Sequence, residues 1–379
     1  MKRLIVILMA LSLSIPGVYA ATEKVPASDP RIVYLGRTLA DASGSVSFDW
    51  SGTSARLGFS GKSLSVRLAS RKTSWFNVWI DRPTSEEPDK VFGLSDEERI
   101  VSIIDADYLA RRFGKQARRH AGDVFKVTIQ RRNEGRDGSV VIKEFICDGT
   151  ISAGEGIRKR VIEFIGDSYT CGYGADTIGR ESKYSPATEN CNHSYCSIVA
   201  RYFDADPVMI AHSGIGVARN SRDRDPGYTM VERYGQTFDM LREPLWDASK
   251  ASFKPDITVI YLCTNDFEQK SQPHFSIFKK RYQELLGKVK ANYGEDHPVL
   301  CVASRSDYYC TDYVRNSVDG CNLKNVAFAA FFESVINNGP DLGAQWHPNY
   351  AGHRKKAHVL IPYISTLTGW EMDPDKPIR

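Results

Sequence analysis

Beyond its first 20 residues, the sequence lacks any apolar run that approaches the roughly 20 residues a membrane-spanning helix needs. It also lacks a strong charge imbalance, because the formal net charge is only +4 over 379 residues. Arg111–His120 is the one notable basic run, and we interpret it as a solvated loop or helix face rather than as a site for an acidic partner. We therefore expect no membrane span in the mature chain and no nucleic-acid partner.

A metal-binding pattern is missing as well. Cys191 and Cys196 have no second matching cysteine pair, and the C-terminal histidines do not share the i, i+4 face of a metal-binding helix. We expect neither a metal nor a cofactor.

The eight cysteines permit disulfides in an exported chain but do not dictate their pairing. Local spacing favours Cys191 with Cys196 and Cys310 with Cys321. The other four stand in apolar or strand-like contexts and are interpreted as small buried residues, namely Cys147, Cys171, Cys263 and Cys301.

The N-terminus has the pattern of an export signal. Lys2-Arg3 precede an apolar run from Leu4 to Ile15, and small residues lead to Ala21. We expect a signal peptide over residues 1–20 and a secreted or periplasmic mature protein. No cysteine stands at the cleavage point, which argues against a lipoprotein anchor.

Residues from about 31 to 149 alternate apolar and polar side chains, most clearly in segments 46–50, 64–68 and 125–130. A period of two is typical of half-buried antiparallel strands. We predict a β-sandwich domain over residues 21–150, followed by a glycine-bearing linker that ends at residue 156.

From residue 157 to residue 379, strand-like segments alternate with helix-like segments such as 195–203 and 278–292. This alternation predicts a parallel sheet covered by helices on both faces. In such folds the functional site lies at the carboxyl ends of the strands.

The most informative segment is Val161–Thr170, where an apolar run stops at Gly166 and the chain then presents Ser168. We expect a strand, a tight turn and a helix start. The backbone N–H groups and the dipole of a helix N-terminus favour an alkoxide or an oxyanion there. The alternative for Ser168 is an ordinary helix cap.

Three later segments supply partners for this serine. His347, just before Pro348-Asn349, offers a base that accepts the serine proton. Strand-like segments 207–211 and 257–262 lead to a glycine-rich turn and to Asn265, respectively. Each has an ordinary interpretation as turn chemistry, but together they offer a three-donor oxyanion hole with the Ser168 amide.

In this order, Gly-Asp-Ser168, the Gly214 segment, Thr-Asn265-Asp266 and His347 resemble the four sequence blocks of the SGNH hydrolases. The wider segments Gly-Asp-Ser-Tyr-Thr-Cys-Gly-Tyr-Gly, Ser-Gly-Ile-Gly-Val-Ala-Arg-Asn and Trp-His-Pro-Asn are similar to family 2 carbohydrate esterases. The resemblance covers nearly the whole mature chain. It implies a jelly-roll β-sandwich followed by an α/β SGNH-hydrolase domain, a three-layer sandwich. It also implies acetyl-esterase activity on plant cell-wall polysaccharides.

One position departs from the family pattern. Gln345 stands two residues before His347, where the family often has the aspartate of a Ser-His-Asp triad, and Ala344 stands three before. Some members are thought to use a Ser-His dyad whose ring is oriented by a main-chain carbonyl. We expect that variant, with the Gln345 side chain turned away from the ring; Asp341 and the Gln345 amide are the other candidates.

The sequence thus predicts an exported carbohydrate O-acetyl esterase that acts on polysaccharides of the xylan or glucomannan type. Ser168 is the predicted nucleophile and His347 the base. The amides of Ser168 and Gly214 and the side chain of Asn265 form the predicted oxyanion hole, with Gly216 as the alternative to Gly214.

Two residues are candidates for substrate binding, Trp346 as a stacking platform for a sugar ring and Asp266 as a polar ligand. Trp346 could equally anchor its own loop. Two rival functions stay open: a carbohydrate-binding protein with a degenerate esterase site, suggested by Gln345, and an SGNH lipase or thioesterase.

Overall fold

The computed structural model describes residues 22–120, 122–223, 227–268, 272–304, 308–332, 335–336 and 339–379. The export signal expected over residues 1–20 lies outside the described residues. Among the described helices, none combines the length and the apolar character needed to cross a membrane.

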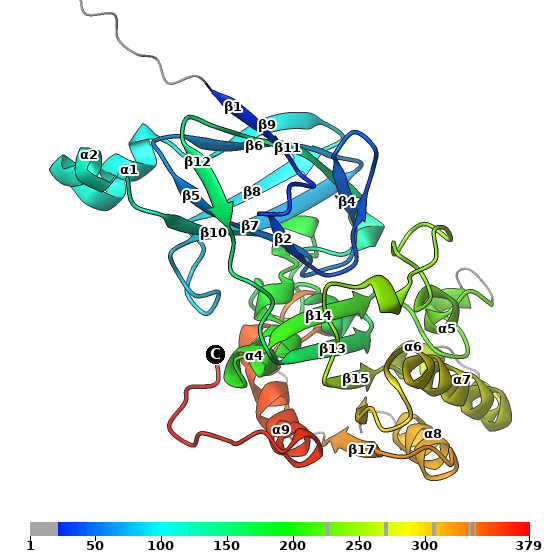
Figure 1. Cartoon of the computed structure of the whole chain (residues 1–379). Coiled ribbons are helices and arrows are strands. Elements are labelled where there is room, and N and C mark those ends of the chain that lie inside the picture. The colour runs from blue at the N-terminus through cyan, green and yellow to red at the C-terminus, as the bar shows by residue number, and fades with distance from the viewer. Residues whose placement is uncertain are drawn as a thin grey trace, which may run out of the picture.

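The N-terminal part of the chain is a sandwich of two antiparallel sheets, drawn in blue to green at the top of Figure 1. One sheet has the order β3-β4-β11-β6-β9 with β1 beside β11, and the other has the order β12-β5-β10-β7-β8 with β2 beside β5. The strands are β1 Glu23–Pro26, β2 Val33–Leu35, β3 Leu39–Ala40, β4 Val46–Phe48, β5 Ser54–Ser60, β6 Leu64–Ser70, β7 Thr73–Ile80, β8 Lys90–Ser95, β9 Glu98–Ile104, β10 Phe125–Arg131, β11 Val140–Cys147 and β12 Thr150–Ala153. Strand β12 occupies part of the segment expected to be a linker.

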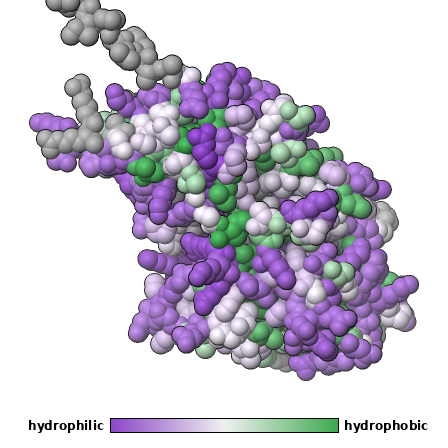
Figure 2. Space-filling view, viewed as in Figure 1, coloured by the Kyte–Doolittle hydropathy of each residue, from purple (hydrophilic) through white to green (hydrophobic). Residues whose placement is uncertain are grey.

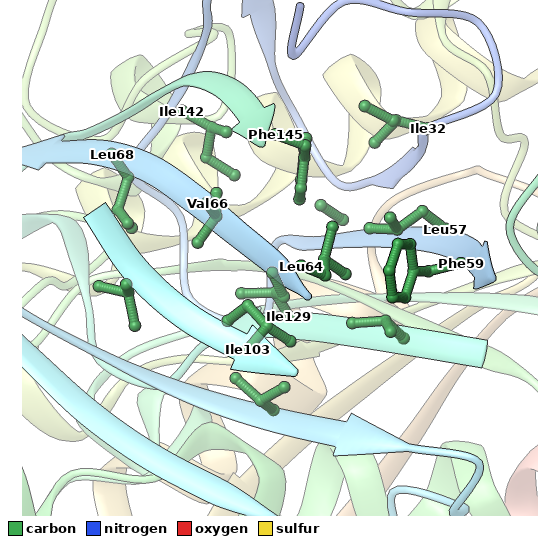
Figure 3. Close-up of a cluster of buried hydrophobic side chains, with 14 of the residues drawn as sticks. Ile32, Leu57, Phe59, Leu64, Val66, Leu68, Ile103, Ile129, Ile142 and Phe145 are labelled. Carbon is green, nitrogen blue, oxygen red and sulfur yellow. The ribbon is translucent and has the colours of Figure 1, made fainter. Parts of the chain in front are cut away.

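The predicted alternation of side chains builds the core of this sandwich. In β6, every second residue from Leu64 to Ser70 is buried. Figure 3 shows Leu64, Val66 and Leu68 beside Ile129 of β10 and Phe145 of β11, which all belong to one buried cluster. Burying one apolar face of each sheet against the other is the main driving force for this domain.

The C-terminal part contains a parallel five-stranded sheet of order β14-β13-β15-β16-β17. Its strands are β13 Val161–Gly166, β14 Asp206–Ala211, β15 Ile257–Tyr261, β16 Val299–Ser304 and β17 Val326–Phe331. β14 lies on one side of β13 and β15 lies on the other. The loops after these three neighbouring strands therefore meet at the carboxyl end of the sheet. These are the loops that carry the predicted site residues.

Helices cover both faces of the parallel sheet (Figure 1). Helices α4 and α9 pack on one face, and α5, α7 and α8 pack on the other. The helices are α1 Ala106–Phe113, α2 Ala117–His120, α3 Ser168–Cys171, α4 Tyr195–Tyr202, α5 Met230–Arg233, α6 Thr264–Phe267, α7 Phe275–Tyr293, α8 Tyr308–Asp319 and α9 Tyr350–Thr368. The predicted fold, a β-sandwich followed by a three-layer α/β domain, is confirmed.

The predicted disulfide pairs are wrong. Cys263 is bonded to Cys310, although 47 residues separate them, because Cys263 directly precedes α6, and α6 packs against α8, which contains Cys310. Cys191 and Cys196 are buried free thiols, and Cys321 is also unbonded. Local spacing favoured near neighbours, whereas the tertiary fold decides which sulfur atoms meet.

The basic run over 111–120 lies mostly in α1 and α2, which project from the sandwich at the left of Figure 1. Arg112 donates hydrogen bonds to the carbonyl of Ile80 and to the hydroxyl of Tyr108, so its guanidinium stabilises the local structure. Figure 2 shows a mostly hydrophilic surface on this face, with hydrophobic residues in small groups.

Candidate active site

The nucleophile segment forms the predicted strand, turn and helix start. All six residues of β13 are buried, Asp167 caps α3 by accepting the N–H of Tyr169, and Ser168 is the first residue of that helix. Only 9% of the Ser168 surface is exposed. Its hydroxyl therefore stands at a helix N-terminus at the carboxyl end of a central strand.

Glycine is required where this turn is tightest. A Cβ atom built on Gly166 would lie 1.9 Å from the hydroxyl oxygen of Thr170 and 3.1 Å from the carbonyl oxygen of Tyr261. Any side chain would push α3 away from the sheet. The glycine of the Gly-Asp-Ser sequence is thus required by packing.

The structure brings Ser168 and His347 together. The Ser168 Oγ and His347 Nε2 atoms lie 2.8 Å apart, although 179 residues separate them in sequence. The other ring nitrogen, Nδ1, lies 3.0 Å from the main-chain carbonyl oxygen of Gln345. A carbonyl only accepts, so Nδ1 carries the proton and Nε2 is left to accept from the serine.

This arrangement confirms the expected main-chain carbonyl at Nδ1. The side chain of Gln345 is turned to Tyr173, whose hydroxyl donates to Oε1 over 2.8 Å. The carboxylate of Asp341 accepts from Lys355 Nζ at 2.5 Å. Within the described part of the chain, the acceptor at Nδ1 is therefore a backbone carbonyl.

An unusual backbone conformation produces that carbonyl contact. Gln345 and Trp346 have φ angles of +52° and +66°, which are uncommon for residues other than glycine. The loop is held by the Thr177 hydroxyl, which accepts the Ala344 N–H at 2.6 Å, and by close packing on Gly174. Such strain persists only where the surroundings over-determine it, and it concentrates at functional sites.

Two tyrosines flank the imidazole of His347. The ring centroids of Tyr169 and Tyr173 lie 5.3 Å and 4.4 Å from that of the histidine. The removal of the ring from water lowers the pKa of His347 to about 4 from an ordinary 6.5. The neutral form, which accepts a proton, therefore predominates at neutral pH.

The predicted backbone donors of the oxyanion hole lie at a cavity beside Ser168 and His347. Ser168 and Gly214 both line it, and neither amide donates to an acceptor within the described residues. The alternative, Gly216, donates its N–H to Asn220 Oδ1 over 3.1 Å. The geometry therefore favours Gly214 over Gly216.

Asn265, the third predicted donor, also lines the cavity. Its Nδ2 donates to the carbonyl of Ile215 at 2.8 Å and to Asp167 Oδ2 at 3.1 Å. The amide is therefore held by Asp167 of the nucleophile turn and by Ile215 of the loop after β14, which carries Gly214 and is called the oxyanion loop below. The longer contact, to Asp167, is the one that a new acceptor would displace more readily.

Asp266 takes a different place from the one expected. It is fully buried, and its carboxylate accepts the backbone N–H groups of Val217, Ala218 and Arg219 at 2.7 to 3.2 Å. Burial outweighs these bonds and raises the pKa of Asp266 to about 6. Asp266 therefore shapes the glycine-rich turn from beneath, and a substrate has no access to it.

Trp346 is not a buried anchor, since 53% of its surface is exposed. The guanidinium of Arg180 lies 4.2 Å from its ring centroid. An exposed indole beside the histidine retains the geometry of a stacking platform.

The cavity beside Ser168 has a volume of about 280 Å³. Its wall is mostly polar, and Ile215 and Tyr173 are among the residues that line it. The lining residues are Arg136, Ser168, Tyr173, His212, Ser213, Gly214, Ile215, Asn220, Ser221, Arg222, Arg233, Asn265, Glu268, Gln345 and His347.

Two regions of the chain match known family models. Residues 164–355 match the GDSL-like Lipase/Acylhydrolase family, and residues 34–153 match the Carbohydrate esterase 2 N-terminal family. The chain belongs to the GDSL-like lipase/acylhydrolase family. The predicted resemblance to family 2 carbohydrate esterases is likewise confirmed, by the second match and by the relatives below.

This family member is 31% identical over 361 residues to the cellulase/esterase CelE of Acetivibrio thermocellus, and the match covers 93% of this chain but 41% of that protein. It is 23% identical over 357 residues to an acetylxylan esterase / glucomannan deacetylase of Cellvibrio japonicus, with 93% of each chain covered. A solved family two carbohydrate esterase from Clostridium thermocellum, in complex with cellohexaose, superposes with a TM-score of 0.78 at 29% identity, covering 90% of this chain and 100% of that one. These comparisons support an esterase.

The GDSL-like domain does not build its cavity alone. Arg136 belongs to the sandwich, where it follows β10, and it lines the cavity beside Tyr173. Sequence reasoning missed this residue and His212, which also lines the cavity and bonds Asp239 at 2.8 Å. The one available signal was the polar run Arg131–Asp137, which interrupts the alternating pattern of the sandwich.

Among the described residues, Glu134, His212 and Asp239 are close enough together to hold a metal ion. Glu134 pairs with the guanidinium of Arg136 at 3.1 Å, and Asp239 pairs with that of Arg233 at 2.9 Å. Two neighbouring guanidinium groups repel a cation, so we assign no metal to this group.

Proposed function

We propose that this protein is an exported carbohydrate O-acetyl esterase that uses a Ser168–His347 dyad. The observation that carries the proposal is the 2.8 Å contact between Ser168 Oγ and His347 Nε2, with Nδ1 directed to a main-chain carbonyl. A serine becomes a competent nucleophile when an adjacent base takes its proton. The names of the two relatives, a cellulase/esterase and an acetylxylan esterase / glucomannan deacetylase, support the same activity.

In the proposed mechanism, Ser168 attacks the carbonyl carbon of an acetyl ester while His347 takes the hydroxyl proton. The negative charge on the carbonyl oxygen is stabilised by the amides of Ser168 and Gly214 and by Asn265, whose Nδ2 turns from Asp167. His347 then protonates the leaving sugar oxygen, and an acetyl-enzyme remains. Water repeats the sequence with the same base and releases acetate.

A polysaccharide substrate of the xylan or glucomannan type is part of this proposal. It is supported by the name of the Cellvibrio japonicus relative and by the cellohexaose complex of the Clostridium thermocellum esterase. Trp346, exposed beside His347, offers an aromatic face to a sugar ring. The mostly polar cavity disfavours a lipase, because a long acyl chain needs apolar surface to leave water.

The test is acetate release from acetylated xylan, acetylated glucomannan and an aryl acetate, with wild type and Ser168→Ala compared. We expect the wild type to deacetylate at least one polysaccharide and the variant to lose hydrolysis while it keeps its fold and sugar binding. A wild type that binds glycan without releasing acetate would establish the binding-protein alternative. A preference for long-chain aryl esters or thioesters would favour the lipase or thioesterase.

Export is proposed from the first 20 residues. Expression of the full chain followed by N-terminal sequencing of the protein recovered outside the cytoplasm tests it, and we expect the mature chain to begin at Ala21. An uncleaved chain in the cytoplasm would contradict it.

A further inference from the structure

A loop of the β-sandwich reaches the predicted oxyanion hole. Glu134, between β10 and β11, is fully buried, and its Oε2 accepts the backbone N–H of Ser213 at 2.6 Å. Ser213 directly precedes Gly214, whose amide is a proposed donor to the oxyanion. A carboxylate of one domain thus holds the catalytic loop of the other.

Glu134 also contacts two other parts of the site. Its carboxylate pairs with Arg136, which lines the cavity, and the thiol of Cys171 at the end of α3 lies 3.8 Å from its Oε2. The Glu134 N–H donates to Glu189 Oε1 at 2.8 Å, which fixes the loop from the other side. The carboxylate therefore lies between the nucleophile helix, the oxyanion loop and the cavity wall.

The conformation of Gly214 explains why the hydrogen bond between Ser213 and Glu134 is important. Gly214 has a φ angle of +82°, and a Cβ placed there would meet nothing closer than 3.5 Å. A glycine in open space has many accessible conformations, so neighbouring contacts must set the direction of its N–H. The Ser213 N–H bond to Glu134 is one such contact, only one residue away.

We propose that Glu134 is a positioning residue for the oxyanion loop, and that the β-sandwich is thereby part of the esterase active site. This inference rests on the proposed esterase function. The carboxylate touches no reacting atom; it acts through Ser213 on the Gly214 amide. The essential property of the side chain is an acceptor oxygen within hydrogen-bonding distance of the Ser213 N–H.

Two conservative variants distinguish the effect of side-chain length at residue 134 from the effect of its negative charge. Glu134→Gln keeps the length and one acceptor oxygen but removes the charge that pairs with Arg136. Glu134→Asp keeps the charge but withdraws the acceptor by one methylene. If Glu134 positions the loop, Glu134→Asp should lower kcat on an aryl acetate roughly tenfold to a hundredfold with little change in KM, because small displacements of a catalytic donor cost that much. Glu134→Gln should stay within about threefold of wild type.

A matched control tests domain docking in general. Arg56 of β5 pairs with Asp206 of β14 at 2.7 Å, which crosses the same domain boundary at the amino end of the parallel sheet, away from the site. Arg56→Met should lower the thermal midpoint without changing kcat. Circular dichroism melts are recorded for all three variants.

Binding of phenylboronic acid gives a readout that a merely structural residue would not move. The compound forms an anionic tetrahedral adduct with a nucleophilic serine, so its affinity depends on the oxyanion donors. We expect its affinity to fall in Glu134→Asp in proportion to kcat and to be unchanged in Arg56→Met.

Three results would overturn the inference: a folded Glu134→Asp with wild-type kcat and boronate affinity, an equal loss in Glu134→Gln and Glu134→Asp, or a Glu134→Asp chain that no longer folds. The first removes the positioning role, the second assigns the role to charge, and the third makes Glu134 a folding residue. If the wild type itself released no acetate, the proposed function would fail before this inference was tested.

Discussion

The main-chain carbonyl of Gln345 accepts the Nδ1 proton of His347 at 3.0 Å, while the side chain of the same glutamine is bonded to Tyr173. Gln345 thus contacts His347 through its backbone carbonyl and Tyr173, which lines the cavity, through its side chain. The carbonyl has no second tautomer and no rotamer, so it holds the ring in one state. This explains how the site can lack an aspartate at that position.

Substitutions at Gln345 should therefore depend on the backbone. Gln345→Ala and Gln345→Gly keep the carbonyl, and we expect a loss of less than about tenfold in kcat from the freed Tyr173 hydroxyl. Gln345→Pro cannot adopt a φ of +52°, so it should move the carbonyl and lower kcat far more. Steady-state kinetics on an aryl acetate, with melts as the folding control, check this. A collapse in Gln345→Gly would show that the amide side chain is the essential group.

The pH profile should report the environment of His347. Burial lowers the pKa of His347 to about 4, and only the neutral ring accepts the serine proton. Activity is lost as the pH falls through that pKa, so kcat/KM at pH 5.5 should stay close to its value at pH 7. With an ordinary histidine pKa of about 6.5, kcat/KM at pH 5.5 would be only about a tenth of its value at pH 7. Circular dichroism at each pH separates titration from unfolding, and an acid limb near pH 6.5 would contradict the expectation.

Asn265 offers a test of the oxyanion hole. Asn265→Ala removes one of the proposed donors, which typically lowers kcat by about a hundredfold to a thousandfold. The effect should fall on kcat rather than KM, because the donor binds charge that develops only in the transition state. Kinetics on an aryl acetate and on acetylated xylan check this. A change in KM alone would identify Asn265 as a ligand of the ground-state sugar.

The proposed role of Trp346 concerns polymeric substrates. Trp346→Ala removes an exposed ring that contacts Arg180, so the fold should tolerate it. We expect KM for acetylated polysaccharide to rise by about fivefold to tenfold, with kinetics on a small aryl acetate nearly unchanged. Equal losses on both substrates would indicate that the tryptophan supports the loop of His347 instead.

The sequence predicted the architecture, and it predicted that Ser168, Gly214, Asn265 and His347 lie together, because both follow from local patterns. Alternation with period two identifies the sandwich, and the residues at the ends of β13, β14 and β15 meet wherever such strands form a parallel sheet. The carbonyl at His347 was expected from the missing carboxylate at Gln345 together with the dyad variant that the family resemblance implies.

Long-range polar contacts were not predictable in the same way. Glu134 and Ser213 are 79 residues apart and belong to different domains, and Glu134 stands in none of the segments that carry the family resemblance. The Cys263–Cys310 bond and the burial of Asp266 likewise depend on how elements pack. A charged residue after a strand has the same local signal whether it faces water or caps a buried turn.

Asp266 provides the test of that last distinction. Its carboxylate accepts three backbone amides of the turn that follows Gly216, so Asp266→Asn turns one acceptor into a donor that faces the same N–H groups. Leaving a buried amide unpaired costs about 1–3 kcal/mol, and the free energy of unfolding in urea should fall by that amount. Gly214 lies in the same loop, three residues before Val217, so kcat should drop while KM for the sugar is retained. A fully stable variant with raised KM would mean that Asp266 contacts the substrate after all.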